Sequence, residues 1–192
     1  MLRILIIVGF LMMTSTGDSF NSTENNTGCQ VVDNALEYLD GHPLDCASGS
    51  VLTSFGMATS TSTQCSSGRE TNYVCTVAPV SSTETRYTAC NLTIGCGIDC
   101  LDRQDVSCNS GEVLSAWELQ TGSCTDTNQQ VQYECSAVDV ASTYTVNGDC
   151  QQSRGENLIF LDRHVVTCAE NEAISAVRLD QGVCSGDDMR FE

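Results

Sequence analysis

The spacing of the cysteines constrains this chain more than any other feature, because most of its thirteen cysteines recur in one frame along 192 residues. Internal repetition at a fixed period is the sequence signature of a repeat architecture. The sequence predicts three copies of one unit, whose successive cysteines are Cys29, Cys46, Cys65 and Cys75, then Cys90, Cys108, Cys124 and Cys135, then Cys150, Cys168 and Cys184.

The segments around the second cysteine of each copy align in the same frame. Residues 39–46, 101–108 and 161–168 begin with Leu-Asp and end with cysteine, at offsets of 62 and 60 residues. Two further cysteines, Cys96 and Cys100, belong to the second copy alone. The three copies are assigned to residues 29–89, 90–149 and 150–192.

The third copy lacks a fourth cysteine, which accounts for the odd total. Tyr73 and Tyr133 stand two positions before the fourth cysteine of their copies, and Phe191 is expected to hold that place in the third. This alignment puts the next cysteine directly after Glu192, so we expect residues 150–192 to be a truncated copy. A thiol used for intermolecular pairing is the alternative.

Side chains within each copy alternate with the period of two that is typical of strands. Over residues 113–119, Val113, Trp117 and Leu119 share the face assigned to the core, and Leu114 falls on the opposite face.

Three more strands are expected over residues 105–108, 131–135 and 143–146, with a tight turn at residues 109–112. Helical spacing occurs only over residues 33–39. The predicted fold is all-β, built of tandem small disulfide-stapled β-meander repeats. The alternative is a single three-fold β-prism in which the copies share one core.

Four cysteines in a unit permit three pairings, and the meander selects one. The strands that lead to Cys108 and Cys135 end at the same side of the unit, and Cys90 and Cys124 lie at the other, so each close pair is expected to bond. Cys96 and Cys100 close a small loop, and Cys168 has no partner. The other pairs, by equivalence, are Cys29–Cys65, Cys46–Cys75 and Cys150–Cys184.

The amino terminus has the layout of a secretory signal peptide, with Arg3 before an apolar run that is too short to span a membrane. Residues 1–17 are assigned to this leader and residues 18–28 to a glycosylated extension. N-glycosylation sequons occur at Asn21, Asn25 and Asn91. Because disulfide scaffolds persist in oxidising compartments, we expect a secreted, extracellular protein.

Charge and motif spacing exclude several classes of ligand. The net charge is −17 and every basic residue is arginine, so nucleic acid and anionic membrane surfaces are disfavoured as partners. Zinc-site spacings and calcium-loop motifs are absent, and no cofactor is expected.

No catalytic set of nucleophile, base and orienting group is recognisable. His42 and His164 occupy one repeat position that Gln104 fills in the second copy, which favours a strand-surface role over catalysis. Trp117 aligns with Phe55 and Val177, so a core position is favoured over a sugar-stacking platform.

Residues 184–191, with their acidic Gly-Asp-Asp turn, are similar to a motif of the vitelline membrane outer layer proteins. The proteins of that family are secreted three-repeat β-prisms. The match is short, occurs in one copy and lacks the glycine–tryptophan signatures of that family, and no membership is assigned.

These observations predict a non-enzymatic extracellular protein with a structural or adhesive role in a matrix, coat or filament. The expected partners are further copies of the chain or other extracellular proteins and glycans, without membrane insertion. The alternative is a secreted carbohydrate-binding module.

Overall fold

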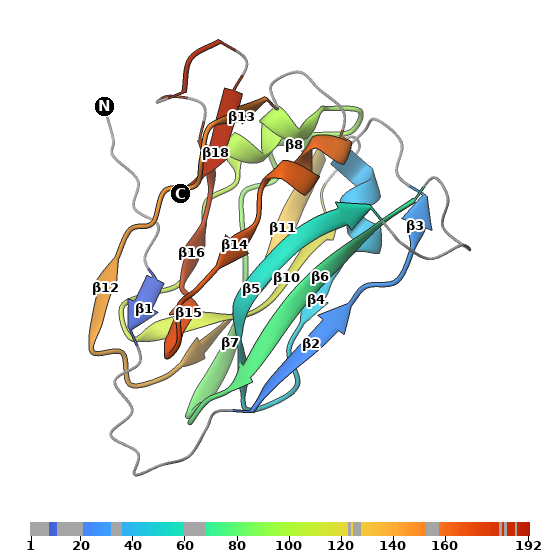
Figure 1. Cartoon of the computed structure of the whole chain (residues 1–192). Coiled ribbons are helices and arrows are strands. Elements are labelled where there is room, and N and C mark those ends of the chain that lie inside the picture. Colours follow the sequence, from blue (N-terminus) through green and yellow to red (C-terminus); the bar gives the residue numbers. More distant parts are fainter. Residues whose placement is uncertain are drawn as a thin grey trace.

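The computed structural model of the chain is mostly β-strand, arranged in several antiparallel sheets with three short 3-10 helices among the described residues (Figure 1). The structure describes residues 8–10, 21–31, 36–59, 68–122, 124, 128–152, 158–180, 182, 184–186 and 188–192.

The first sheet is built on two ten-residue strands, β5 (Ser50–Thr59) and β6 (Gly68–Val77). Strand β2 (Ser22–Asn26) pairs with the far edge of β6, so part of the predicted glycosylated extension belongs to a sheet. Strands β14 (Val166–Thr167) and β3 (Gln30–Val31) add short pairings to β5 and β6.

The second sheet has the same order of long and short strands. Strands β10 (Glu112–Gln120) and β11 (Asn128–Ala137) form its centre, and β7 (Ser82–Tyr87) pairs with β11. Strands β4 (Leu44–Asp45) and β8 (Leu92–Thr93) pair with β10 and β11.

The remaining strands are short and pair with one another in three small sheets. The strand β1 (Val8–Phe10), which falls within the predicted leader, lies between the β-strands β12 (Ser142–Tyr144) and β15 (Glu172–Ile174). The other pairings join β16 (Ala176–Val177) to β9 (Val106–Ser107), and β18 (Asp188–Phe191) to both β13 (Gln151–Gln152) and β17 (Leu179–Asp180).

Three two-residue strands pair with segments far away in the sequence, which departs from the predicted meander. Strand β9, which leads to Cys108, pairs with β16 rather than with β10. Strand β4 pairs with β10, and β14 pairs with β5. The cysteine that directly follows each of these strands extends the pairing by one hydrogen bond. The backbone N–H groups of Cys46, Cys108 and Cys168 donate to the carbonyls of Ser115, Ser175 and Thr53 at 2.9 Å.

The predicted alternation along residues 113–119 is broken by a β-bulge. The register of β10 against β11 shifts between Leu114 and Ala116. The register of β5 against β6 shifts at the matching position of the first sheet, between Leu52 and Ser54. An extra residue changes which side chains face inward. Leu114 therefore lies in the main core, contrary to the assignment from the sequence, and Val113 packs in a second cluster.

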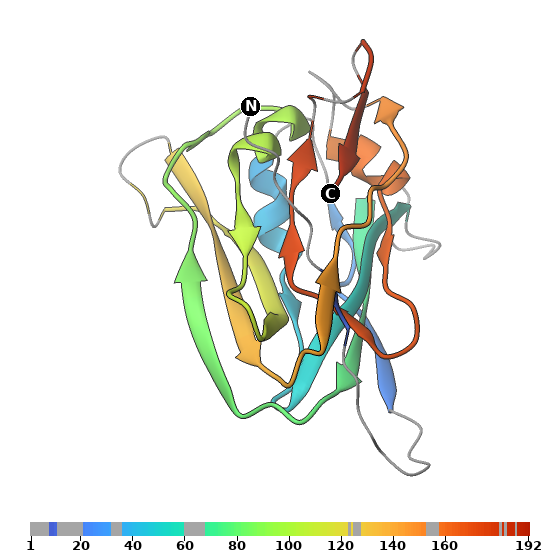
Figure 2. The same cartoon turned by 90° about the vertical axis from the view of Figure 1, so that its left-hand side faces the viewer.

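The three 3-10 helices lie together at one end of the molecule (Figures 1 and 2). The first, η1 (Leu36–Gly41), overlaps the predicted helical turn, whereas η2 (Ile98–Arg103) and η3 (Leu158–Arg163) were not predicted. Each of these helices has six residues, which are too few to produce an amphipathic period that can be recognised in the sequence. The residue that directly follows each helix donates its backbone N–H to the carbonyl of the leucine three positions earlier. These hydrogen bonds join His42 to Leu39, Gln104 to Leu101 and His164 to Leu161.

One main hydrophobic cluster draws its buried side chains from all parts of the chain. Leu36, Leu114 and Leu158 are fully buried in it, although more than forty residues separate each from the next. A smaller cluster of Val51, Ala78, Val113, Val138 and Ala173 lies apart from it.

Five disulfides join described cysteines, and all are among the pairs proposed from the sequence. Cys46–Cys75 and Cys108–Cys135 have Cα–Cα distances of 5.6 Å, and Cys90–Cys124 and Cys150–Cys184 have distances of 5.8 and 5.7 Å. Cys96–Cys100 closes the short loop. Cys65, the proposed partner of Cys29, lies outside the described residues.

The strand register corrects the assignment of Phe191. Phe191 pairs with Leu179 as Val131 pairs with Leu119, so its counterpart is Val131 rather than Tyr133. The alignment by aromatic identity was two residues out of register.

Candidate functional site

A cavity of about 60 Å³ lies at the end of the molecule that carries the three helices. A leucine from each helix lines it: Leu39, Leu101 and Leu161. Aromatic side chains from three strands complete much of the wall: Phe55, Trp117 and Phe191. Several polar side chains also contribute, among them the two histidines and the glutamine that share a position in the predicted repeat.

His42, Gln104 and His164 are buried, with 1%, 3% and 5% of their surface exposed, so the predicted strand-surface role is wrong. Each follows a leucine by three residues at the carboxyl end of its helix, which turns the side chain inward toward the cavity wall. The sequence did not indicate this because the helices themselves were not recognised.

Two threonines hold two of these side chains in the same way. The hydroxyl of Thr88 accepts from the N–H of Val131 at 2.9 Å and donates to Gln104 Oε1, which can only accept. The hydroxyl of Thr27 accepts from the N–H of Thr71 at 3.0 Å and lies 2.8 Å from His42 Nδ1.

The matching geometry indicates the tautomer of His42. If the Thr27 hydroxyl donates to Nδ1, as its counterpart donates to Gln104, the ring proton of neutral His42 is on Nε2. This Nε2 is buried and has no hydrogen-bond partner within the described part of the chain. In that tautomer, His42 has an N–H beside the cavity for which the described residues offer no acceptor.

Burial lowers the pKa of His42 below its ordinary value, and the opposing effect of Asp40 is smaller. Burial also lowers the pKa of His164, with Arg163 acting in the same direction and Asp162 opposing it. Both rings are therefore held neutral near physiological pH.

These lowered pKa values predict a loss of stability in acid. Since the folded chain binds these protons less readily than the unfolded chain, its stability falls as the pH drops below about 6.5, the ordinary histidine pKa. A His42→Gln, His164→Gln double variant, which copies Gln104, should show a shallower decrease between about pH 7 and pH 5. Urea unfolding across that range measures the difference, and parallel curves for the two proteins would contradict the prediction.

Trp117, the possible sugar-stacking residue, and the neighbouring strand's Tyr133 lie in different surroundings. Tyr133 is 7% exposed and its hydroxyl donates to the carbonyl of Ser107 at 3.3 Å, so its ring belongs to the core. Trp117 is partly buried, packs against the main hydrophobic cluster and lines the cavity. The core position that the sequence favoured for Trp117 therefore describes this residue in part.

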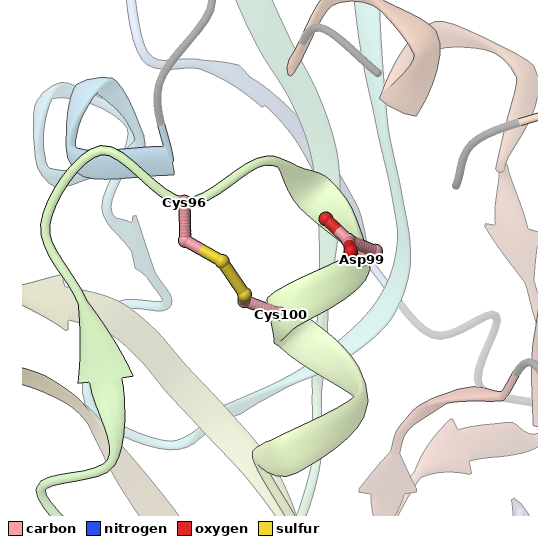
Figure 3. Close-up of side chains that lie close together, drawn as sticks. All are labelled: Cys96, Asp99 and Cys100. Carbon is pink, nitrogen blue, oxygen red and sulfur yellow. A yellow bond between two sulfur atoms is a disulfide. The ribbon is translucent and has the colours of Figure 1, made fainter. Parts of the chain in front are cut away.

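Cys96, Asp99 and Cys100 bring metal-ligand atom types close together, on η2 and the loop before it (Figure 3). The two sulfur atoms are bonded to each other. A sulfur in a disulfide is not the thiolate that metals bind, so this group is a covalent loop closure and leaves one carboxylate for an ion.

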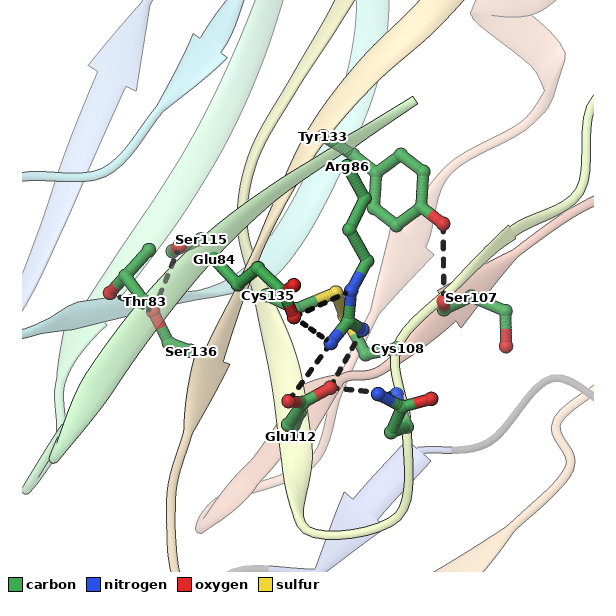
Figure 4. The surroundings of a disulfide bond; sticks show 11 residues. Thr83, Glu84, Arg86, Ser107, Cys108, Glu112, Ser115, Tyr133, Cys135 and Ser136 are labelled. Carbon is green, nitrogen blue, oxygen red and sulfur yellow. Dashed lines mark hydrogen bonds and ion pairs between the residues drawn. A yellow bond between two sulfur atoms is a disulfide. The ribbon is translucent and has the colours of Figure 1, made fainter. Parts of the chain in front are cut away.

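An ion-pair network surrounds the Cys108–Cys135 disulfide (Figure 4). Arg86 on β7 donates to Glu112 at 2.7 Å and also to Glu84. Glu112 in turn accepts from the N–H of Asn109 at 2.8 Å, which ties the preceding turn to β10. The hydrogen bond from Arg86 lowers the pKa of Glu112 and keeps this carboxylate ionised. The arrangement fastens β7 to the sheet and has no nucleophile among its members.

Cys168 is the one free cysteine in the described ranges, and it is partly buried. Burial, with a smaller effect of Glu172, raises its pKa to about 12. A thiol with this pKa holds very little of the reactive thiolate at neutral pH.

Cys168 should therefore react slowly with iodoacetamide at about pH 8 in the folded chain and rapidly after denaturation without reductant. Mass spectrometry of the alkylated protein follows the reaction. Equal rates of alkylation in the folded and the unfolded chain would mean that the Cys168 thiol is not buried and that its pKa is not raised.

The three sequon asparagines are available to different extents. Asn21 and Asn91 are exposed, whereas Asn25 is half-buried and its amide donates to the carbonyl of Thr23 at 3.1 Å. The Asn91 side chain donates to the carbonyl of Arg103 at 3.3 Å and accepts from Gln104, which connects it to the cavity wall.

Comparison with known proteins gives no relative: no family model, no curated protein and no solved structure matches the chain. None of the helices in the described ranges is long and apolar enough to cross a membrane.

Proposed function

We propose that the chain is a single three-fold β-prism of three repeats and serves as a secreted, non-enzymatic structural or adhesive protein of an extracellular coat, matrix or filament. The observation that carries the architecture is the cyclic strand exchange. The first copy gives β4 to the sheet of the second, the second gives β9 to the strands of the third, and the third gives β14 to the sheet of the first.

Two further observations support three equivalent copies. The disulfides Cys90–Cys124 and Cys150–Cys184 both span 34 residues, and Cys46–Cys75 and Cys108–Cys135 span 29 and 27. The bulge in β5 and that in β10 fall at matching positions. An exchange that closes on itself favours one shared core over separate units joined like beads.

A structural role follows from this architecture and its cross-links. Several disulfides staple a core that the copies build together, which suits a rigid building block in an oxidising environment. The described site residues provide buried neutral histidines, an ion pair and a disulfide-closed loop, and this set lacks an activated nucleophile. Glycans at Asn21 and Asn91 are part of the proposal because both residues are exposed.

Carbohydrate binding has weaker support. Trp117, the possible sugar-stacking residue, packs partly against the core. Tyr133, a second aromatic side chain that could have served, is buried and hydrogen-bonded.

Expression of the whole chain with its own leader tests the proposal. The expected product enters the medium, loses mass on enzymatic N-deglycosylation and forms assemblies that electron microscopy resolves. A monodisperse monomer that is retained on a glycan array, and that loses this retention on Trp117→Ala, would favour the lectin alternative instead.

A further inference from the structure

We propose that the cavity at the helix end binds a small, uncharged, mainly apolar molecule with one hydrogen-bond acceptor. The first argument concerns size and lining. At about 60 Å³ the cavity is several times larger than the ~10–15 Å³ that a single water requires. Its wall is built mostly from leucine, valine and aromatic side chains. Water gains few hydrogen bonds in such a space, and apolar molecules bind there readily.

The second argument concerns charge. His42 and His164 are neutral because burial lowers their pKa values. Among the described lining residues, Arg178 is the one that carries a charge, and Asp102 lies near enough for their charges to interact. Burial raises the pKa of Asp102, while Arg103 and Arg178 oppose that rise. The cationic charge is therefore partly compensated, and the site favours neither a cation nor an anion.

The third argument concerns the unsatisfied donor. A buried donor without a partner destabilises the folded chain, and an acceptor on a ligand removes that penalty. His42 lines the cavity and has a buried, unpartnered Nε2. The hydrogen bond of Nδ1 with Thr27 leaves Nε2 as the ring nitrogen that has no described partner. A carbonyl or ether oxygen is the matching group.

The origin of the cavity follows from the register, and this step rests on the proposed equivalence of the copies. Phe55 pairs with Val166, Trp117 with Leu44, and Val177 with Val106. The third copy thus has a valine where the others have aromatic rings. Because the valine side chain is smaller than an aromatic ring, it leaves space beside Phe55 and Trp117. A ligand ring about as large as a phenyl ring fills this space.

The test uses the whole chain with cyclohexanone as the probe and cyclohexanecarboxylate as its charged counterpart. We expect saturation-transfer NMR signals for cyclohexanone, together with a shift of the Trp117 indole N–H, the one indole in the sequence. Val177→Phe should reduce the saturation transfer by roughly tenfold because the new ring occupies the cavity.

Val165→Phe is the matched control, since Val165 is 63% exposed and outside the cavity. It should bind cyclohexanone like the original chain. Thermal unfolding of both variants establishes that they are folded. No saturation transfer to the original chain, an undiminished signal in folded Val177→Phe, or stronger binding of the carboxylate would overturn the proposal. These outcomes leave the structural role untouched, because assembly is measured separately.

Discussion

Replacing Cys108 and Cys135 together with alanine is expected to lower the free energy of unfolding by about 3–4 kcal/mol. The bond closes a loop with a sequence separation of 27 residues, and chain entropy alone gives a loss of this size when such a loop is opened. Cys135 is 1% exposed and Cys108 is 7% exposed, so two alanines also leave unfilled space in the core.

The matched control opens the smallest loop. Cys96 and Cys100 are four residues apart, and the same entropy relation gives about 2 kcal/mol for their replacement. Chemical unfolding of the two double variants under non-reducing conditions compares the losses. A larger loss for the Cys96, Cys100 variant would contradict the role assigned to the Cys108–Cys135 bond.

Leu114→Ala is expected to destabilise the protein by about 2–5 kcal/mol. Leu114 is 0% exposed in the main core, where the β-bulge of β10 directs it. Strict alternation along residues 113–119 would place this side chain on the solvent side and predict almost no effect. The variant therefore separates the bulged strand from the regular one.

Glu118→Ala, in the same strand, provides the comparison. Glu118 is half-buried, and its described side-chain contact is the hydrogen bond that it accepts from Gln120 at 2.6 Å. We expect a change within about 1 kcal/mol. Urea unfolding midpoints of both variants decide the matter, and similar small shifts for the two would argue against the bulge.

The sequence predicted the local features of this fold better than its long-range ones. The strand around Trp117 was predicted, although a bulge interrupts its alternation. The turn before Glu112 follows from Asn109 and Gly111, which adopts a positive φ of 85°. Cysteine pairs such as Cys90–Cys124 were derived from a meander, and they are present although β9 pairs with β16 instead of β10. The strand, the turn and this pair each depend on residues at most 34 positions apart.

The features that the sequence did not predict depend on distant partners or on one extra residue. Strand β9 pairs with β16 about seventy residues away, and two-residue strands carry too little pattern to indicate a partner. The bulge at Ser115 inverts the faces without leaving a glycine or proline as a marker. Histidine and glutamine alternate at the repeat position of His42, Gln104 and His164, and this variation was interpreted as a sign of a surface position. Buried polar side chains of similar length can replace one another in the same way.

One measurement tests the central claim of a shared core most directly. Trp117 belongs to the second copy and is the only tryptophan in the chain, so its fluorescence reports unfolding at one place. Leu52 in the first copy and Ile174 in the third are both essentially buried in the main cluster. If the three copies share one core, Leu52→Ala and Ile174→Ala should each shift the Trp117 unfolding midpoint in urea, by a loss of about 2–5 kcal/mol. A Trp117 transition that stays unchanged in both variants, while circular dichroism records a separate earlier transition, would contradict the shared core and favour three independent units.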